Sequence, residues 1–250
     1  MNDQNAVANP RNRRQRNRRS KRRIRKPESP LLQAIEENAH EEIDRLIVSG
    51  EDVNLITYGN RIPLHVAIDK NAHEVINRLI ENGADLNAQD SWGETPLHYA
   101  AKHADGHEIA RILIQHGTKI NIKSKYAQKT PLHIATESNA QKTAELLIEN
   151  GAEINVTDRF KLTPLHSAAY HRDAYPIVKQ LIQHGAHVNI KDCDFKTPLH
   201  RAVLHSEPNM LDILIRNGCV QFLARRKILK LPYQSYQYCY MGVRMSILRM

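Results

Sequence analysis

One four-residue motif, Thr-Pro-Leu-His, recurs along the chain at an almost constant interval. It stands four times unchanged and twice in looser form, at residues 95–98, 130–133, 163–166 and 197–200, and at residues 62–65 and 29–32. Successive prolines of the motif lie 33 to 35 residues apart. Self-similarity at such a period indicates one structural unit stacked on copies of itself, and it favours binding over catalysis.

The copy at residues 62–94 predicts two short helices and a loop. Pro63 suits the first position of a helix, because its φ is preset and its missing N–H would have no partner there. Asn71 ends that helix, a second apolar-faced helix runs over about residues 73–81, and Gly83 ends it. A helix pair this short cannot bury its apolar side alone, so several copies must stack to share a core.

Three recurring features together resemble the ankyrin repeat. They are Thr-Pro-Leu-His-x-Ala, a second helix that ends in Leu-Ile/Leu-x-x-Gly-Ala, and Val/Ile/Leu-Asn-x-x-Asp in the loop that follows. The resemblance covers about residues 29–218. It implies an all-α solenoid of antiparallel helix pairs with projecting hairpin loops. It further implies a non-catalytic protein-binding module that uses its concave side and needs no cofactor.

The punctuation divides the chain into three regions. Residues 1–28 are predicted to be a disordered arginine-rich tail, and residues 219–250 a basic, tyrosine-rich C-terminal cap or tail. About six repeats lie between them, over about residues 29–61, 62–94, 95–129, 130–162, 163–196 and 197–218. Additional residues near 104–106 and 173–174 are expected to lengthen the turn between the two helices of their repeats.

Charge is distributed unevenly along the chain, which has a formal net charge of +9. Residues 28–218 carry 19 basic and 26 acidic residues, whereas the segments before and after them are strongly basic. An acidic array steers basic or amphipathic surfaces towards itself, so a basic or amphipathic partner surface is expected.

The basic charge is concentrated in residues 11–26, which hold eleven positive charges, one aliphatic residue and no aromatic residue. Such a segment cannot bury enough apolar area to fold alone. It suits recognition by an import receptor, contact with RNA or DNA phosphates without sequence preference, or a solvated tether to the acidic array. The residues predicted to carry nuclear targeting or nucleic-acid contact are Arg11, Arg13, Arg14, Arg16, Arg18, Arg19, Lys21, Arg22, Arg23, Arg25 and Lys26.

Every turn between repeats carries one aromatic residue, although aromatic residues make up only 5% of the chain. Aromatic side chains are favoured anchors of protein interfaces. The alternative is that each ring packs on the neighbouring loop and stiffens the array. The predicted partner-binding residues at these turns are Tyr58, Trp92, Tyr126, Phe160 and Phe195.

A second candidate set lies on the first helix of each repeat, just after Leu-His-x-Ala. Its residue types differ from copy to copy, as a tailored binding surface requires and as any solvated surface allows. In an ankyrin-like stack these positions would line the groove. The predicted partner-binding residues of this set are Asp69, Lys102, Glu137, Tyr170 and Leu204. Positions three residues earlier share their face.

The sequence gives no support for catalysis or a metal site. It contains none of the phosphate-loop, dinucleotide-binding, nucleophile-elbow or HExxH motifs. Five of the 14 histidines stand in the repeat motif, where a ring nitrogen can bond nearby backbone between repeats. No catalytic and no metal-ligating residue is therefore assigned.

Two segments around Asn87 and Asn155 resemble sites that asparaginyl hydroxylases modify in ankyrin proteins, which implies such an enzyme as a partner. The alternative is that these asparagines bond their own turns. Three cysteines without a metal or disulfide spacing favour a reducing compartment, and no secretory signal or membrane span is apparent. The expected location is intracellular, in the nucleus, the cytoplasm or both.

The C-terminal segment is open to several interpretations. A basic, apolar stretch runs into Leu231-Pro232 and is similar in part to the box that couples some ankyrin proteins to ubiquitin ligases. The spacing is shorter than in that box and its usual cysteine is missing. A cap on the last repeat, a partner helix or a membrane-surface segment are the alternatives. A substrate adaptor of a ubiquitin ligase, or a host-interference protein, therefore stands beside simple protein binding.

Overall fold

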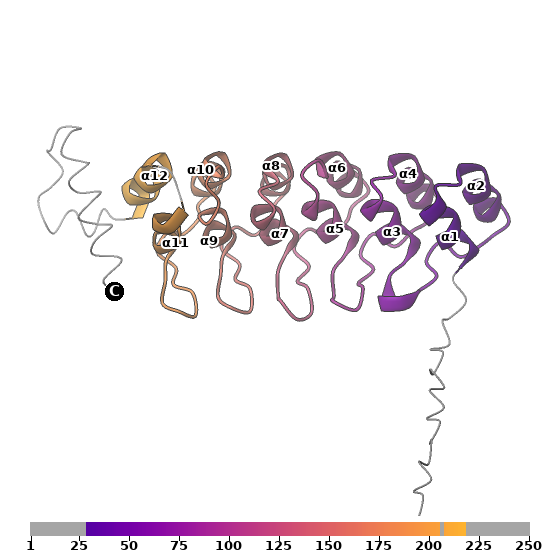
Figure 1. Ribbon diagram of the computed structural model, residues 1–250, viewed down its shortest axis with the longest axis horizontal. Coiled ribbons are helices and arrows are strands. Elements are labelled where there is room, and N and C mark those ends of the chain that lie inside the picture. The colour runs from indigo at the N-terminus through magenta and orange to yellow at the C-terminus, as the bar shows by residue number, and fades with distance from the viewer. Residues whose placement is uncertain (1–28, 206–207, 219–250) are drawn as a thin grey trace, which may run out of the picture.

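The computed structural model describes residues 29–205 and 208–218, which form six pairs of helices and no strand (Figure 1). In chain order the pairs are α1 (Pro30–Glu37) and α2 (His40–Val48), α3 (Pro63–Asp69) and α4 (His73–Glu81), α5 (Pro96–Lys102) and α6 (His107–Gln115), α7 (Pro131–Glu137) and α8 (Gln141–Glu149), α9 (Pro164–Ala168) and α10 (Tyr175–Gln183), and α11 (Pro198–His205) and α12 (Pro208–Gly218). The all-α fold class is confirmed.

The helices form two rows (Figure 1). The odd-numbered helices lie side by side in one row and the even-numbered helices in the other, and the long loops project beyond the odd-numbered row. Each odd-numbered helix packs on its own partner and on the next odd-numbered helix. A one-residue-wide periodicity in sequence thus becomes a one-dimensional stack, in which each pair contacts only its neighbours.

The leucine and alanine of the repeat motif make the shared core. Leu64, Leu97, Leu132 and Leu165 are at most 1% exposed, and the alanines three positions later are fully buried. Alanine brings no bulk, so neighbouring first helices can approach closely there. These residues join the apolar faces of the second helices in one continuous cluster. Sharing of this kind is what allows helices of five to eleven residues to persist.

The motif histidines connect each repeat to the next. In the central repeat, Nδ1 of His133 accepts the backbone N–H of Thr130 at 3.2 Å, which places the ring proton on Nε2. That Nε2 lies 3.0 Å from the carbonyl oxygen of Leu162, just before the next motif. His65, His98 and His166 make the same two contacts. The predicted structural role of these rings is confirmed.

The loop asparagines also join neighbouring repeats. Nδ2 of Asn155 donates to the carbonyl oxygen of Gly185 at 2.9 Å, and its Oδ1 accepts the N–H of His187 at 2.7 Å. Asn54 and Asn121 make the same pair of bonds one repeat further on. The alternative that each asparagine bonds its own turn is therefore wrong, because the acceptor it reaches is the end of the next second helix.

Two helix-to-helix turns are longer than the others, as predicted. Residues 103–106 join α5 to α6 and residues 169–174 join α9 to α10, whereas three residues join α3 to α4 and α7 to α8. The additional residues are accommodated in these turns, so the pairs on either side stay in register.

Gly93 is predicted to be intolerant of any side chain. It has φ +75°, and a Cβ added there would lie 2.3 Å from the backbone nitrogen of Lys125 in the next loop. Gly83 has φ +84° with nothing within 4 Å, so it isolates the backbone effect. Urea unfolding of Gly93→Ala should show a loss of about 2–4 kcal/mol, against about 1–2 kcal/mol for Gly83→Ala. Equal losses would contradict the close approach of the two loops.

The predictions for residues 1–28 and 219–250 fall outside the described residues, as do residues 206–207. The longest helix in the described ranges has 11 residues, and none of those helices has the length and apolar character of a membrane span.

Candidate protein-binding surface

Each long loop turns around one polar side chain. In three loops this residue is an aspartate, and its Oδ1 accepts two backbone N–H groups of the turn. Asp158, for example, accepts from Phe160 at 2.8 Å and from Leu162 at 2.9 Å. Asp90 and Asp192 hold their turns in the same way. A carboxylate at this place fixes the loop and projects the next two or three side chains outward.

Backbone hydrogen bonds join successive loops near their tips. The N–H of Lys125 donates to the carbonyl oxygen of Trp92 at 2.8 Å, and the N–H of Cys193 donates to that of Phe160 at 3.0 Å. Corresponding bonds start at Ser91 and Arg159. The tips thus form a connected row, and their side chains have a fixed spacing along the array.

We use the name tip row for Tyr58, Trp92, Tyr126, Phe160 and Phe195. All five side chains are exposed, with exposed fractions of 85%, 66%, 53%, 49% and 77% in chain order. Exposure of every scarce large ring on one row of loops is unusual for residues that fill cores. The row has the composition of an interface anchor set.

The tip row is less regular than its sequence spacing. Trp92, Tyr126 and Phe160 occupy one position of the turn, two residues after the turn-holding side chain. Phe195 stands one residue further on and has φ +61°, a left-handed conformation that is rare for a bulky residue. Tyr58 stands one residue earlier, within a short 3-10 turn. The three central rings therefore make the coherent part of the row.

The ring-on-loop alternative holds for part of the tip row. Trp92 and Tyr126 meet edge to face, with ring centroids 5.9 Å apart. Lys125 Nζ lies 5.3 Å from the centre of the Tyr126 ring, and the Arg159 guanidinium carbon 5.0 Å from that of Phe160. These contacts leave about half or more of each ring exposed. The rings are therefore both oriented by their neighbours and open to a partner.

The charged members of the first-helix set are held by ion pairs with the loop that precedes them. Lys129 Nζ lies 2.7 Å from Oε1 of Glu137. Arg61 pairs with Asp69, and Lys102 pairs with Glu94, across the same eight-residue interval. Pairs of this kind on a partly exposed surface contribute little stability, on the order of 0–1 kcal/mol. They do fix where charge is presented beside the loops.

The positions three residues earlier are more deeply placed. Val66, Tyr99, Ile134 and Ser167 are 7–8% exposed, so they form the floor between helix ends and loops rather than a contact surface. Tyr99 donates its hydroxyl to Oδ2 of Asp90 at 2.8 Å. Burial, with this bond to a carboxylate, raises the pKa of Tyr99 well above its ordinary value.

Tyr170 is half-exposed and lies edge to face with His171. The backbone of Leu204 belongs to α11, but its side chain is outside the described part of the chain. The eleven basic residues of the N-terminal segment are outside it as well.

The motif histidines are electrostatically neutral elements of the frame. Burial lowers the pKa of His65, His98, His133, His166 and His200, against the opposing effect of nearby acids or backbone oxygens. For His133 the pKa falls to about 4. Within residues 29–205 and 208–218 no three His, Cys, Asp or Glu side chains come together as metal ligands would.

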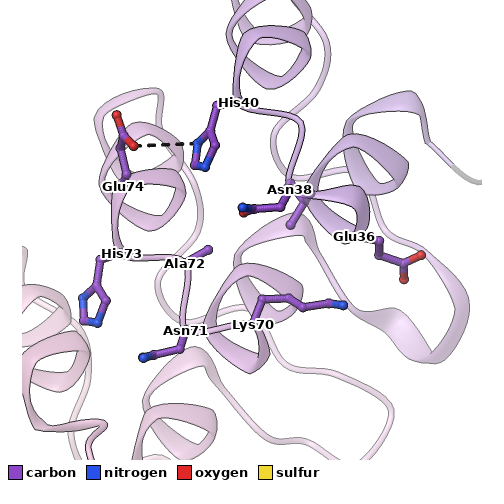
Figure 2. A pocket seen from close by; sticks show the side chains of 9 residues that line it. Glu36, Asn38, His40, Lys70, Asn71, Ala72, His73 and Glu74 are labelled. Carbon is purple, nitrogen blue, oxygen red and sulfur yellow. Dashed lines mark ion pairs between the residues drawn. The ribbon is translucent and has the colours of Figure 1, made fainter.

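A surface hollow lies between the helix-to-helix turns of the first two pairs (Figure 2). His40 and Glu74 face each other across it, with Nδ1 and Oε2 3.7 Å apart. Asn38 and Asn71, at the ends of α1 and α3, contribute to its rim. None of the predicted partner-binding residues lines it, so the candidate surface remains the tip row with the first-helix positions.

Sequence reasoning missed the links that connect the two candidate sets. The eight-residue ion pairs could have been found, because a charge before the motif and an opposite charge eight residues later recur in three copies. The turn-holding aspartates had a signal too, since Asp90, Asp158 and Asp192 stand at one position of the repeat.

The comparison with known families agrees with this geometry. The profile of ankyrin repeats matches the chain in three copies, at residues 9–90, 72–158 and 154–223. A search of curated proteins found no match. The three matches extend over most of the 250 residues, and the chain therefore belongs to the ankyrin-repeat family.

Proposed function

We propose that this protein is a non-catalytic binding module of six repeats, one for each helix pair, that holds a partner protein on the tip row and the adjoining first-helix positions. Ankyrin repeats are generally protein-interaction modules, and the family is typically non-enzymatic. The observation that carries the proposal is the exposure of five aromatic side chains on hydrogen-bonded loops. Ordered rings lose little conformational freedom on binding, which favours them as anchors.

The experiment compares partner capture by the full chain and by its surface variants. In Trp92→Ala and Phe160→Ala we expect recovery of the bound protein to fall about tenfold or more, because anchor residues of this kind contribute at least 2 kcal/mol each when truncated. Arg111→Ala and Lys179→Ala, at exposed sites on the second helices, are the matched controls and should leave recovery unchanged. Unchanged recovery in both tip variants would count against the tip row as the contact surface.

The arginine-rich segment is proposed to act as an address or a second electrostatic contact. A chain without residues 11–26 should lose nuclear accumulation and keep its protein partners. If RNA or DNA binding disappears instead, with a salt dependence of the kind that phosphate contacts produce, the protein is a nucleic-acid-associated recruiter.

Two further partners are proposed from the ankyrin resemblance. A ubiquitin-ligase adaptor or a host-interference protein would co-purify with a cullin complex that is lost when residues 219–250 are removed. An asparaginyl hydroxylase would add one oxygen atom to Asn87 or Asn155, which mass spectrometry of the isolated protein detects. Because Asn155 bridges two repeats, such an enzyme would have to open that bridge.

A further inference from the structure

The turn-holding residue of each loop is matched to the residue on the following first helix that faces it. Oδ2 of Asp90 accepts the hydroxyl of Tyr99 at 2.8 Å, and Oδ2 of Asp192 accepts the Arg201 guanidinium at 2.7 Å. In both cases the donor stands nine residues after the aspartate. The second carboxylate oxygen is thereby satisfied from within the chain.

Where the loop has no aspartate, no donor is supplied. The turn-holding residue of the first long loop is Thr57, and the facing residue nine positions later is Val66. The turn-holding residue of the third is Ser124, whose Oγ accepts the N–H of Lys129, and the facing residue is Ile134. Acid with donor, and neutral with apolar, are the two solutions used by four of the five loops.

The fifth case departs from both solutions. Asp158 is followed nine residues later by Ser167, whose side chain is far shorter than that of Tyr99 or Arg201. Ser167 Oγ donates weakly to Oε1 of Glu137 at 3.4 Å, and not to the aspartate. Oδ2 of Asp158 is buried and has no hydrogen-bond partner, although the residue is only 5% exposed.

The nearby lysines do not fill this place. Lys129 Nζ is paired with Glu137, and Lys123 Nζ donates to the carbonyl oxygen of Thr157 at 3.1 Å. Leaving a buried carboxylate oxygen without a donor costs on the order of 1–3 kcal/mol or more. A cation supplied from outside recovers that cost, which a neutral ligand without a donor does not.

We propose that Asp158 Oδ2, with the short Ser167 beside it, is a socket for one arginine side chain of the bound protein. The neighbouring repeat shows how it would be used: Nε and one terminal nitrogen of Arg201 lie 3.2 and 2.7 Å from Oδ2 of Asp192. The arginine enters between α9 and the loop, along the path that Tyr99 and Arg201 take in their own repeats. Phe160 at the tip of the same loop is exposed beside it. The socket rests on the proposed function, and it names the chemistry of the contact.

The socket can be tested without knowing the partner, with N-acetyl-arginine amide as the probe and the full chain labelled for NMR. The backbone amides of Phe160 and Leu162 report on Asp158, because they donate to its Oδ1. We expect saturable shifts of these two amides with the arginine probe. The isosteric, uncharged N-acetyl-citrulline amide should not produce them.

The same molecule contains two control turns. The amides of Trp92 and Glu94 report on Asp90, and those of Asp194 and Lys196 on Asp192, where the second oxygen is already bonded. These four amides should not move with the probe in a saturable way. Equal shifts at all three turns, or none at Phe160 and Leu162, would overturn the socket; the latter result means that Oδ2 bonds water in solution.

Two variants complete the test. Asp158→Asn keeps an oxygen that can hold the turn and removes the charge, so it should weaken probe binding about tenfold or more. Ser167→Arg supplies the donor found in the next repeat, so it should raise the melting temperature by about 2–4 °C and abolish the probe response. A probe response that survives in either variant contradicts the proposal.

Partner capture separates the socket from the proposed function. If Ser167→Arg keeps the captured protein while Trp92→Ala and Phe160→Ala lose it, the binding module stands and the socket is wrong. If all three variants keep it, both the tip row and the socket are wrong. If all three lose it while the second-helix controls keep it, both are supported.

Discussion

Acidification from pH 7 to pH 5 is expected to destabilise the array by about 2 kcal/mol through His133 alone. Burial lowers the pKa of this ring to about 4, whereas in the unfolded chain it titrates near its ordinary value. The unfolded state therefore takes up a proton as the pH falls through about 6.5, and the folded state does not until about pH 4. Stability is fully present above that window and is lost as the pH falls.

The same direction holds for the other motif histidines. Burial also lowers the pKa of His65, His98, His166 and His200, so their contributions add to that of His133. The structure explains the direction, because Nδ1 of each ring accepts a backbone N–H and cannot carry a proton without breaking that bond. The total loss should exceed that expected from any single site.

Urea unfolding at pH 7 and at pH 5 measures this effect. His133→Gln should be less stable at pH 7, but its loss on acidification should be smaller than that of the unchanged chain by about 2 kcal/mol. His116→Gln is the control, because that ring is exposed and bonds only the Ile112 carbonyl oxygen of its own helix. An equal acid loss in His133→Gln and the unchanged chain would show that the motif histidine is not the source.

The second large effect is expected in the centre of the stack. Leu132 is 1% exposed on α7, between α5 and α9. Truncation to alanine should cost about 2–5 kcal/mol, since a leucine of this kind leaves a cavity that neighbours fill only in part. Because each pair contacts only its neighbours, the defect should also uncouple the two halves and split unfolding into two transitions.

Leu214 gives the matched control for that prediction. It is 2% exposed on α12, the last helix of the described stack. Leu214→Ala should loosen the last pair and leave the main transition of the remaining pairs in place. Hydrogen exchange distinguishes the two variants, because the loss of protection should spread from α7 in one and stay at α11 and α12 in the other. A single shared transition lowered equally by both variants would contradict a stack of nearest-neighbour contacts.

Much of the fold could be predicted from local signals. The bounds of α4 match the predicted helix, because Asn71 and Gly83 stop the chain on either side and the apolar face has helical spacing. The motif histidines could be placed because the same residue recurs at the same point of the unit. In a repeat protein the period supplies the long-range contacts that a single sequence usually conceals.

The site was less predictable, because its details depend on which atoms meet across repeats. A spacing of 35 residues suggested that Phe195 extends the tip row, yet its turn places it one residue beyond Trp92 and Phe160. The loop asparagines were open to a local interpretation, and their partners lie about 30 residues away. The unpartnered oxygen of Asp158 is visible only when the loops are compared in space.

Photo-crosslinking from defined positions of the full chain tests most directly whether the tip row and first-helix positions hold a protein. With p-benzoylphenylalanine in place of Tyr126 on the tip row, we expect a discrete protein adduct after irradiation. The same group in place of Lys179, exposed on the second helix α10, should give none. Adducts from residue 179 alone, or equally from both positions, would contradict a partner held on the tip row.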